Sequence, residues 1–170
     1  MFQRIIGIFK LDVKTFEEIE HDSNATSQAA LLVAIVALLS AVGAGIGATF
    51  QKTGFFGSFI GTLIWVFVGW ILWSAVTWFV GTKLFGGQAT LDEMLRVIGF
   101  AHAPQFLAII PCIGGIIGVI WSLIAGFIAV RQGLDLDNLK TLTILVGFII
   151  VVIGQVLITT VMGGLGHLFG

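Results

Sequence analysis

Charge is scarce in this chain of 170 residues, and the few charged side chains stand close together. Only 10% of the residues are charged, whereas soluble domains usually carry about 25%. Four stretches have no charge at all: 29 residues after Asp22, 30 after Lys52, 34 after Arg96 and 30 after Lys140. A bilayer core needs about 20 apolar residues as helix. The scarcity of charge therefore excludes a soluble globular domain and predicts an all-α, polytopic membrane protein.

Cysteine and recognisable reaction motifs are also scarce. The single cysteine, Cys112, excludes an intrachain disulfide and a cysteine-based metal cluster. The chain has no glycine loop ending in Lys-Ser/Thr, no HExxH motif and no CxxC motif. We therefore expect no enzyme activity, no cofactor and no metal. The net charge of −1 gives no reason to expect a nucleic-acid partner.

The 34-residue uncharged stretch decides the number of spans. As one straight helix it would extend about 51 Å, far beyond the bilayer core. Pro104 and Pro111 interrupt it, and Gly114-Gly115 follows the second proline. Proline breaks a helix and a glycine pair allows a tight reversal. The sequence thus predicts five transmembrane helices, at 27–50, 57–81, 91–110, 113–131 and 141–163.

The distribution of basic residues gives the orientation. With five spans and a cytoplasmic N-terminus, only Lys52 lies outside, and seven of the eight Lys and Arg lie inside. Those seven are Arg4, Lys10, Lys14, Lys83, Arg96, Arg131 and Lys140. Cytoplasmic loops are enriched in Lys and Arg. We therefore expect a multi-pass membrane protein with its N-terminus in the cytoplasm and its C-terminus outside.

Residues 1–24 form a lead-in to a membrane domain at 25–170. Phe2, Ile5, Ile6 and Phe9 recur at helical spacing, as do Val13, Phe16 and Ile19. This pattern favours amphipathic helices in the cytoplasmic interface; the alternative is a solvated lead-in. Glu17, Glu18, Glu20 and Asp22 are expected to be the solvated face of such a helix. The first span is too long for the apolar core of a signal peptide, so we expect it to be retained.

Small residues predict where helices pack. Gly114, Gly118, Ser122 and Gly126 repeat every four residues and so line one face of the fourth span. Small side chains let helix backbones approach closely in lipid. The stripe predicts contact with another span, in the same chain or in a second copy. A homo-oligomer or a larger membrane complex is therefore an expected partner besides the lipid bilayer.

Tryptophans are concentrated in the second span. Trp65, Trp70, Trp73 and Trp78 spread over more than half of the helix circumference. One reading is a lipid or another hydrophobic ligand near Trp65, Trp70 and Trp73. The other is ordinary packing and contact with lipid.

The third span carries the polar residues. Thr90 and Glu93 have the spacing of a capping box, which predicts that the helix begins at Leu91. Arg96 is expected to extend to the cytoplasmic headgroups. His102 and Gln105 lie deeper, where polar groups usually face other helices and are often functional. His102, Gln105, Gln155 and Arg96 are the candidate intramembrane polar site. Alternatively, His102 binds a carbonyl freed by Pro104 or the amide of Gln155.

Two segments also resemble a known family. The first runs from Gly86 through Arg96 to Pro104, and the second, IPCIGGIIGVIW, runs from Ile110 to Trp121. The lead-in KLDVKTFEEI, at 10–19, is similar to the family's usual start. The chain resembles prokaryotic members of the Yip family, the small membrane proteins related to the Rab-interacting Yip proteins of eukaryotes. The resemblance implies five spans and a cytoplasmic N-terminus, and His102 departs from it.

Two functions fit this pattern. The first is a non-enzymatic scaffold, accessory subunit or membrane-organising factor that acts through helix–helix packing. The second is a small transporter or channel whose path is lined by the polar residues of the third span, because broken helices near the midplane mark transporter sites. The resemblance does not carry Rab binding over to this chain.

Overall fold

The computed structural model is built from helices. It describes residues 1–50, 52, 54–109, 114–147 and 149–150, and these contain no β-strand. Its elements are α1 (Phe2–Phe9), α2 (Val13–His21), α3 (Ala25–Phe50), α4 (Phe55–Leu84), α5 (Leu91–Phe100), the 3₁₀ helix η1 (Ala103–Ile109) and α6 (Gly114–Gly133). A further helical segment covers 138–147. The predicted all-α class is therefore confirmed for the described residues.

Two helices are long and apolar enough to cross a bilayer. They are α3, with 26 residues, and α4, with 30. A shorter apolar helix covers Ile117–Gly133. The predicted spans at 27–50 and 57–81 fall inside α3 and α4; α3 begins two residues earlier and ends at the same residue, and α4 extends beyond its span at both ends. Most of the predicted fifth span, 141–163, lies outside the described residues.

The third predicted span is not one continuous helix. α5 ends at Phe100, and the backbone continues as η1 from Ala103. The amide of His102 donates to the Gly99 carbonyl at 3.2 Å, a tighter turn than that of an α-helix. Pro104 cannot donate a backbone hydrogen bond and disfavours α geometry in the residue before it, which explains the change. Pro111 lies outside the described residues.

α5 is the centre of the bundle. It packs against α2, α3, α4 and α6. Met94, Val97 and Phe100 are among its fully buried side chains. A Cβ on Gly99 would lie 2.8 Å from the Ala29 side chain, so only glycine allows α5 to approach α3 this closely. This central position brings every polar side chain of α5 close to another helix.

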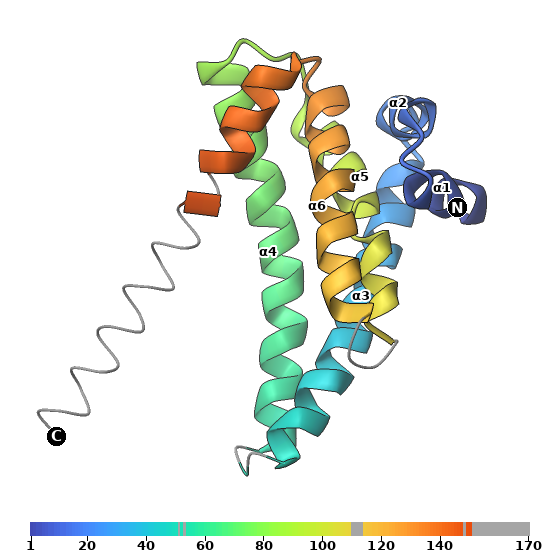
Figure 1. The fold of residues 1–170 in the computed structure, drawn as a ribbon, viewed down its shortest axis with the longest axis vertical. Coiled ribbons are helices and arrows are strands. Elements are labelled where there is room, and N and C mark those ends of the chain that lie inside the picture. Colours follow the sequence, from blue (N-terminus) through green and yellow to red (C-terminus); the bar gives the residue numbers. More distant parts are fainter. Residues whose placement is uncertain (51, 53, 110–113, 148, 151–170) are drawn as a thin grey trace, which may run out of the picture.

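α1 and α2 cover the side of the bundle away from α4 (Figure 1). α2 packs against α5 and α6, and α1 against α2, η1 and α6. Ile8, Phe16 and Ile19 supply the apolar face and are fully buried. The predicted amphipathic lead-in is therefore helical, and its apolar face rests on the rest of the protein.

Candidate functional site

The polar end of α5 begins with a capping box. Thr90 Oγ1 accepts a hydrogen bond from the Glu93 amide at 3.2 Å, and Glu93 Oε2 accepts one from the Thr90 amide at 2.7 Å. The first amides of a helix have no hydrogen-bond acceptors within the helix, and the Thr90 and Glu93 side chains provide acceptors for two of these amides. The predicted box and the predicted start at Leu91 are confirmed. The box places Asp92 and Glu93 one turn before Arg96.

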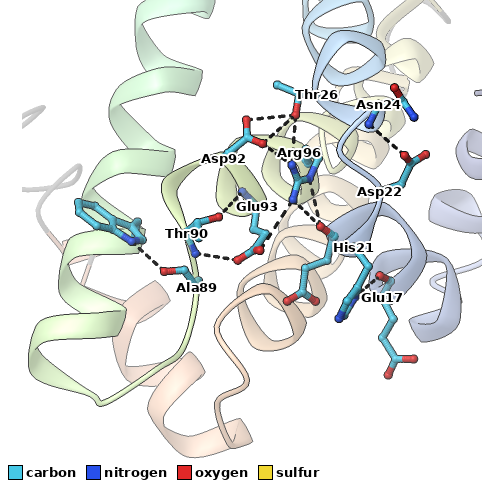
Figure 2. Close-up of polar contacts among 12 residues, drawn as sticks. Glu17, His21, Asp22, Asn24, Thr26, Ala89, Thr90, Asp92, Glu93 and Arg96 are labelled. Carbon is cyan, nitrogen blue, oxygen red and sulfur yellow. Dashed lines mark hydrogen bonds and ion pairs between the residues drawn. The ribbon is translucent and has the colours of Figure 1, made fainter.

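Arg96 is the centre of a buried polar network (Figure 2). Only 5% of the residue is exposed. It forms an ion pair with Asp92, and its Nη2 atom lies 3.9 Å from Glu93 Oε1. Its Nη1 donates to Thr26 Oγ1 at 3.4 Å, and that hydroxyl in turn donates to Asp92 at 3.1 Å. Arg96 therefore joins α5 to the start of α3.

Arg96 also holds α2. Its Nε and Nη2 atoms donate to the main-chain carbonyl of Glu20 at 3.1 and 2.6 Å. The last carbonyls of a helix have no partner within the helix and favour a nearby cation. The expectation that Arg96 extends to the headgroups is wrong, because the guanidinium is buried against the last turn of α2 instead.

The side chain of Glu20 is buried beneath α2, and only 7% of the residue is exposed. Burial raises the pKa of this carboxyl to about 7, and the nearby charges of Asp135 and Glu93 raise it further, whereas His21 and Arg96 lower it. Burial disfavours the charged form of a carboxyl. Glu20 therefore changes its protonation near neutral pH.

A second network joins α1 to the bundle. Arg4 Nη2 donates to Glu18 Oε1 at 2.9 Å and to Asp22 Oδ2 at 2.5 Å. Arg4 Nη1 donates to Gln28 Oε1 at 3.1 Å, so the side chain connects α1, α2 and α3. The hydrogen bond from Arg4 lowers the pKa of the Asp22 carboxyl, and the amide of Asn24 lowers it further.

Three indoles fasten one segment to another. Trp70 donates to the Leu95 carbonyl, Trp78 to the Ala89 carbonyl and Trp121 to the Phe9 carbonyl, each at 3.0 Å. Trp121 thus binds the last residue of α1, as Arg96 binds the last turn of α2. Each N-terminal helix is held at its C-terminal end by a donor from the bundle.

A family comparison agrees with this arrangement. The family model described as the Yip1 domain matches residues 6–160. The chain belongs to the Yip1 domain family. The match begins within α1, so it includes α2 and the Arg96 network as well as the bundle. No curated protein and no solved structure matches the chain.

The predicted intramembrane site is only partly described in this Yip1 domain. His102 Nδ1, in the turn after α5, donates to the Ile98 carbonyl near the end of α5 at 2.8 Å. The His102 amide, which would bond the Ile98 carbonyl in a continuous α-helix, bonds Gly99 instead, so the His102 ring takes a carbonyl freed where the helix changes before Pro104. The hydrogen-bond partners of Arg96 among the described residues lie in α2, α3 and α5, and His102 is not one of them. Gln105 is half-buried in η1, and Gln155 lies outside the described residues. A shared site, and the transport path based on it, stay predictions.

The small-residue stripe of α6 has two different environments. A Cβ on Gly118 would lie 3.0 Å from the Pro104 carbonyl oxygen, whereas one on Gly126 would have nothing described within 4 Å. The Ser122 hydroxyl is buried and has no hydrogen-bond partner among the described residues. Gly114 is the first residue of α6. The stripe therefore meets η1 at Gly118, and Gly126 is open.

The tryptophans of α4 do not share one site. Trp70 is buried against α5, Trp73 packs against the core, and Trp65 is 74% exposed. Trp65 lines an open groove of about 570 Å³ between α3 and α4 together with Ala44, Gly47, Ala48, Ser58, Gly61 and Thr62. A hydrophobic ligand near Trp65, Trp70 and Trp73 stays a prediction.

Several residues of the site were not predicted. Glu20 was expected on the solvated face of α2, and this is wrong, whereas Glu17 and Glu18 are exposed as expected. Glu20 follows Phe16 by four residues and so lies on the same face of the helix, which is the signal that could have revealed it. The partners of Trp121 and Arg96 are 112 and 76 residues away in sequence, and no local pattern indicates them.

Proposed function

We propose that this Yip1 domain is a non-enzymatic membrane scaffold, an accessory subunit or membrane-organising factor that binds other membrane proteins through helix–helix packing. It crosses a prokaryotic cytoplasmic membrane five times, with its N-terminus in the cytoplasm. Family membership supports the membrane location. The scarcity of charge between the basic clusters supports the number of spans, and the distribution of Lys and Arg supports the orientation.

The surface of α4 carries this proposal. Phe56, Ile64, Trp65 and Leu72 are more than half exposed along its length. Gly57 and Gly61 on α4 and Gly43 and Gly47 on α3 have four-residue spacing, and a Cβ at any of them would meet nothing within 4 Å among the described atoms. Closely approaching backbones at small residues drive helix association in lipid. The open groove is therefore a surface that a helix of another protein can pack against.

The polar residues support a structural role. The polar side chains around α5 form hydrogen bonds with backbone groups and neighbouring side chains, as at Arg96, Thr90 and Trp70. These contacts hold helices in position. They give the scaffold a fixed shape on which an exposed helix surface can be presented.

Native mass spectrometry in a mild detergent tests the scaffold. We expect an oligomer or a co-purifying membrane protein, and we expect Gly61→Leu to remove it because the leucine fills the groove. Ile64→Leu is the matched control, since it changes an exposed side chain of α4 without adding volume to the groove. A strictly monomeric wild-type particle with no bound protein contradicts the proposal.

The orientation is tested separately, with accessibility tags on the two ends of the chain. We expect the tags to be reached from opposite sides of the membrane. Labelling of both tags from the same side would overturn the number of spans, without bearing on the groove.

A further inference from the structure

The carboxyl of Glu20 has an unusual position. It is buried beneath α2, where α2 packs against α5 and α6. The charged groups that act on it are His21 from its own helix, Arg96 and Glu93 from α5, and Asp135 from the turn after α6. Two of these four groups are carboxylates, of which Glu93 is partly buried and Asp135 is exposed, so ionised Glu20 would add a third negative charge to this region.

Arg96 does not neutralise this side chain directly. Its Nε and Nη2 atoms donate to the main-chain oxygen of Glu20, and its Nη1 atom is taken by Asp92 and Thr26. Within the described residues, the ion pairs of Arg96 are with Asp92 and Glu93. The guanidinium therefore fixes the backbone of α2, while the charges of Asp135 and Glu93 disfavour the ionised form of the Glu20 carboxyl.

We propose that the docking of α2 onto α5 and α6 is linked to a proton on Glu20. When Glu20 is neutral, its side chain fits the buried interface and α2 stays docked. When Glu20 ionises, the interface must hold another negative charge beside Glu93 and Asp135, and α2 is loosened. Trp121 and Arg4 keep α1 connected, so the change is confined to how tightly the N-terminal helices rest on the bundle.

The sign of the pH effect follows from the two protonation equilibria. The pKa of Glu20 is about 7 in the docked state, because of burial, against 4.5 for an ordinary glutamate. Between these values the docked state holds the proton and the undocked state does not. Docking therefore weakens as pH rises, by at most about tenfold per pH unit and about 300-fold in total, and it changes no further above the docked pKa.

Loosening would uncover a membrane-binding surface. Phe16 and Ile19 are fully buried in the docked state, and they lie on the same face of α2. Exposed Lys14, Glu17 and Glu18 lie elsewhere on this helix. A helix with one apolar and one charged face fits the boundary between headgroups and acyl chains. The released α2 would therefore rest on the bilayer.

Spin-label distance measurements test the proposal. Cys112 is the single cysteine, so Cys112→Ser gives a background in which Lys14→Cys on α2 and Leu139→Cys on the bundle carry the only labels. Both positions are exposed. In reconstituted full-length protein we expect one narrow distance distribution at pH 4.5. We expect a broader and longer one at pH 8.5, with the change falling between about pH 4.5 and 7.

Two variants separate this effect from general unfolding. Glu20→Gln carries a neutral side chain of the same shape, and we expect the narrow distribution at both pH values. Glu17→Gln is the matched control on an exposed face of the same helix, and we expect it to behave as wild type. A wild-type distribution that does not change with pH overturns the proposal, and so does a Glu20→Gln protein that responds as wild type does.

Asp135→Asn gives an independent test if Glu20→Gln does not fold. Asp135 has φ of 52°, a conformation that asparagine also tolerates. Removing its charge lowers the docked pKa of Glu20 toward the undocked value, so docking should weaken less as pH rises, and the distance distribution at pH 8.5 should be narrower than that of wild type. A distribution at pH 8.5 that is as broad as that of wild type, or broader, contradicts the proposed linkage.

Discussion

Main-chain carbonyls at helix ends are the acceptors for several buried donors of this protein. The Arg96 guanidinium binds the Glu20 carbonyl, and the Trp121 indole binds the Phe9 carbonyl. Each carbonyl lies in the last turn of its helix, where no amide of that helix can reach it. A single side chain therefore both satisfies a carbonyl and fixes a helix in place. Changes at these donors should affect the position of a helix more than its formation.

Replacing Arg96 with lysine should release α2. Lysine keeps the charge but cannot bind the Glu20 carbonyl and Asp92 with a planar fork, so we expect a loss of about 2 kcal/mol in α2 docking. Limited trypsin digestion of reconstituted protein measures this loss, through faster cleavage after Lys10 and Lys14. Arg131→Lys is the matched control. Equal cleavage rates in all three proteins would contradict the role given to Arg96.

Removing the hydroxyl of Thr90 should destabilise the start of α5. Thr90→Ala loses the acceptor for the Glu93 amide, which should lower the free energy of unfolding by about 1 kcal/mol. Thr90→Ser retains the hydroxyl and should stay within a few tenths of a kcal/mol of wild type. Thermal unfolding in detergent compares the three proteins, and equal losses for alanine and serine would show that the hydrogen bond is not the cause.

At the scale of the element, glycine decides how closely two helices approach. Gly118 faces the backbone of η1, and Gly126, two turns along α6, faces no described atom within 4 Å. The two residues have the same spacing pattern in the sequence but different surroundings in the structure. The atom nearest to Gly118 is the main-chain carbonyl oxygen of Pro104. A backbone atom cannot rotate away from a new methyl group as the end of a flexible side chain can.

Alanine at these two glycines should have opposite consequences. Gly118→Ala places a methyl group 3.0 Å from the Pro104 carbonyl oxygen, so η1 must shift, at a cost of about 1–3 kcal/mol. Gly126→Ala adds a methyl group to open space and should be neutral or slightly stabilising, because alanine is the better helix former. Thermal unfolding of the two variants side by side gives the comparison. Equal destabilisation would mean that Gly126 is also in close contact with another helix, either of this chain or of a partner protein.

The predictable parts of the fold are those set by local sequence. Long uncharged stretches gave α3 and α4, and the spacing of Thr90 and Glu93 gave the start of α5. The sequence predicts one helix over 91–110, and the structure differs by changing to a 3₁₀ helix after Phe100, because the backbone adjusts before Pro104 as well as at it. Glu20 was misassigned because its neighbours Glu17 and Glu18 are exposed, and only tertiary packing buries one acid of the cluster. The contacts of Arg96 and Trp121 join distant segments, and no short-range pattern encodes them.

At the scale of the whole molecule, two carboxylates set opposite pH limits for the N-terminal helices. Asp22 has a lowered pKa, so the stability that it gives to the docked helices is fully present above the ordinary pKa of 3.8 and is lost as pH falls through the pKa of the docked state. Glu20 has a raised pKa, so the stability that it gives to the docked helices is fully present below pH 4.5 and is lost as pH rises to about 7. Both contributions are fully present only at about pH 4, between these two ordinary pKa values.

The docking of α1 and α2 should therefore have an optimum at about pH 4, between the ordinary pKa values of the two carboxyls. Protection of the N-terminal amides in hydrogen exchange, corrected for intrinsic rates, measures it. Asp22→Asn should remove only the fall in protection at acid pH, and Glu20→Gln should remove only the fall in protection toward neutral pH. A profile that rises steadily toward alkaline pH would be incompatible with both assignments.

The unequal lengths of the helices have a consequence for the surrounding lipid. At 1.5 Å per residue, α4 extends about 45 Å and α6 about 30 Å, close to the thickness of an ordinary hydrocarbon layer. A tilt of about 20° shortens the longer helix by only a few ångströms. With both helices crossing the membrane, as proposed, we expect the lipids beside α4 to stretch and those beside α6 to keep their ordinary length. The protein should impose a thickness gradient across its own perimeter and partition toward thicker membranes.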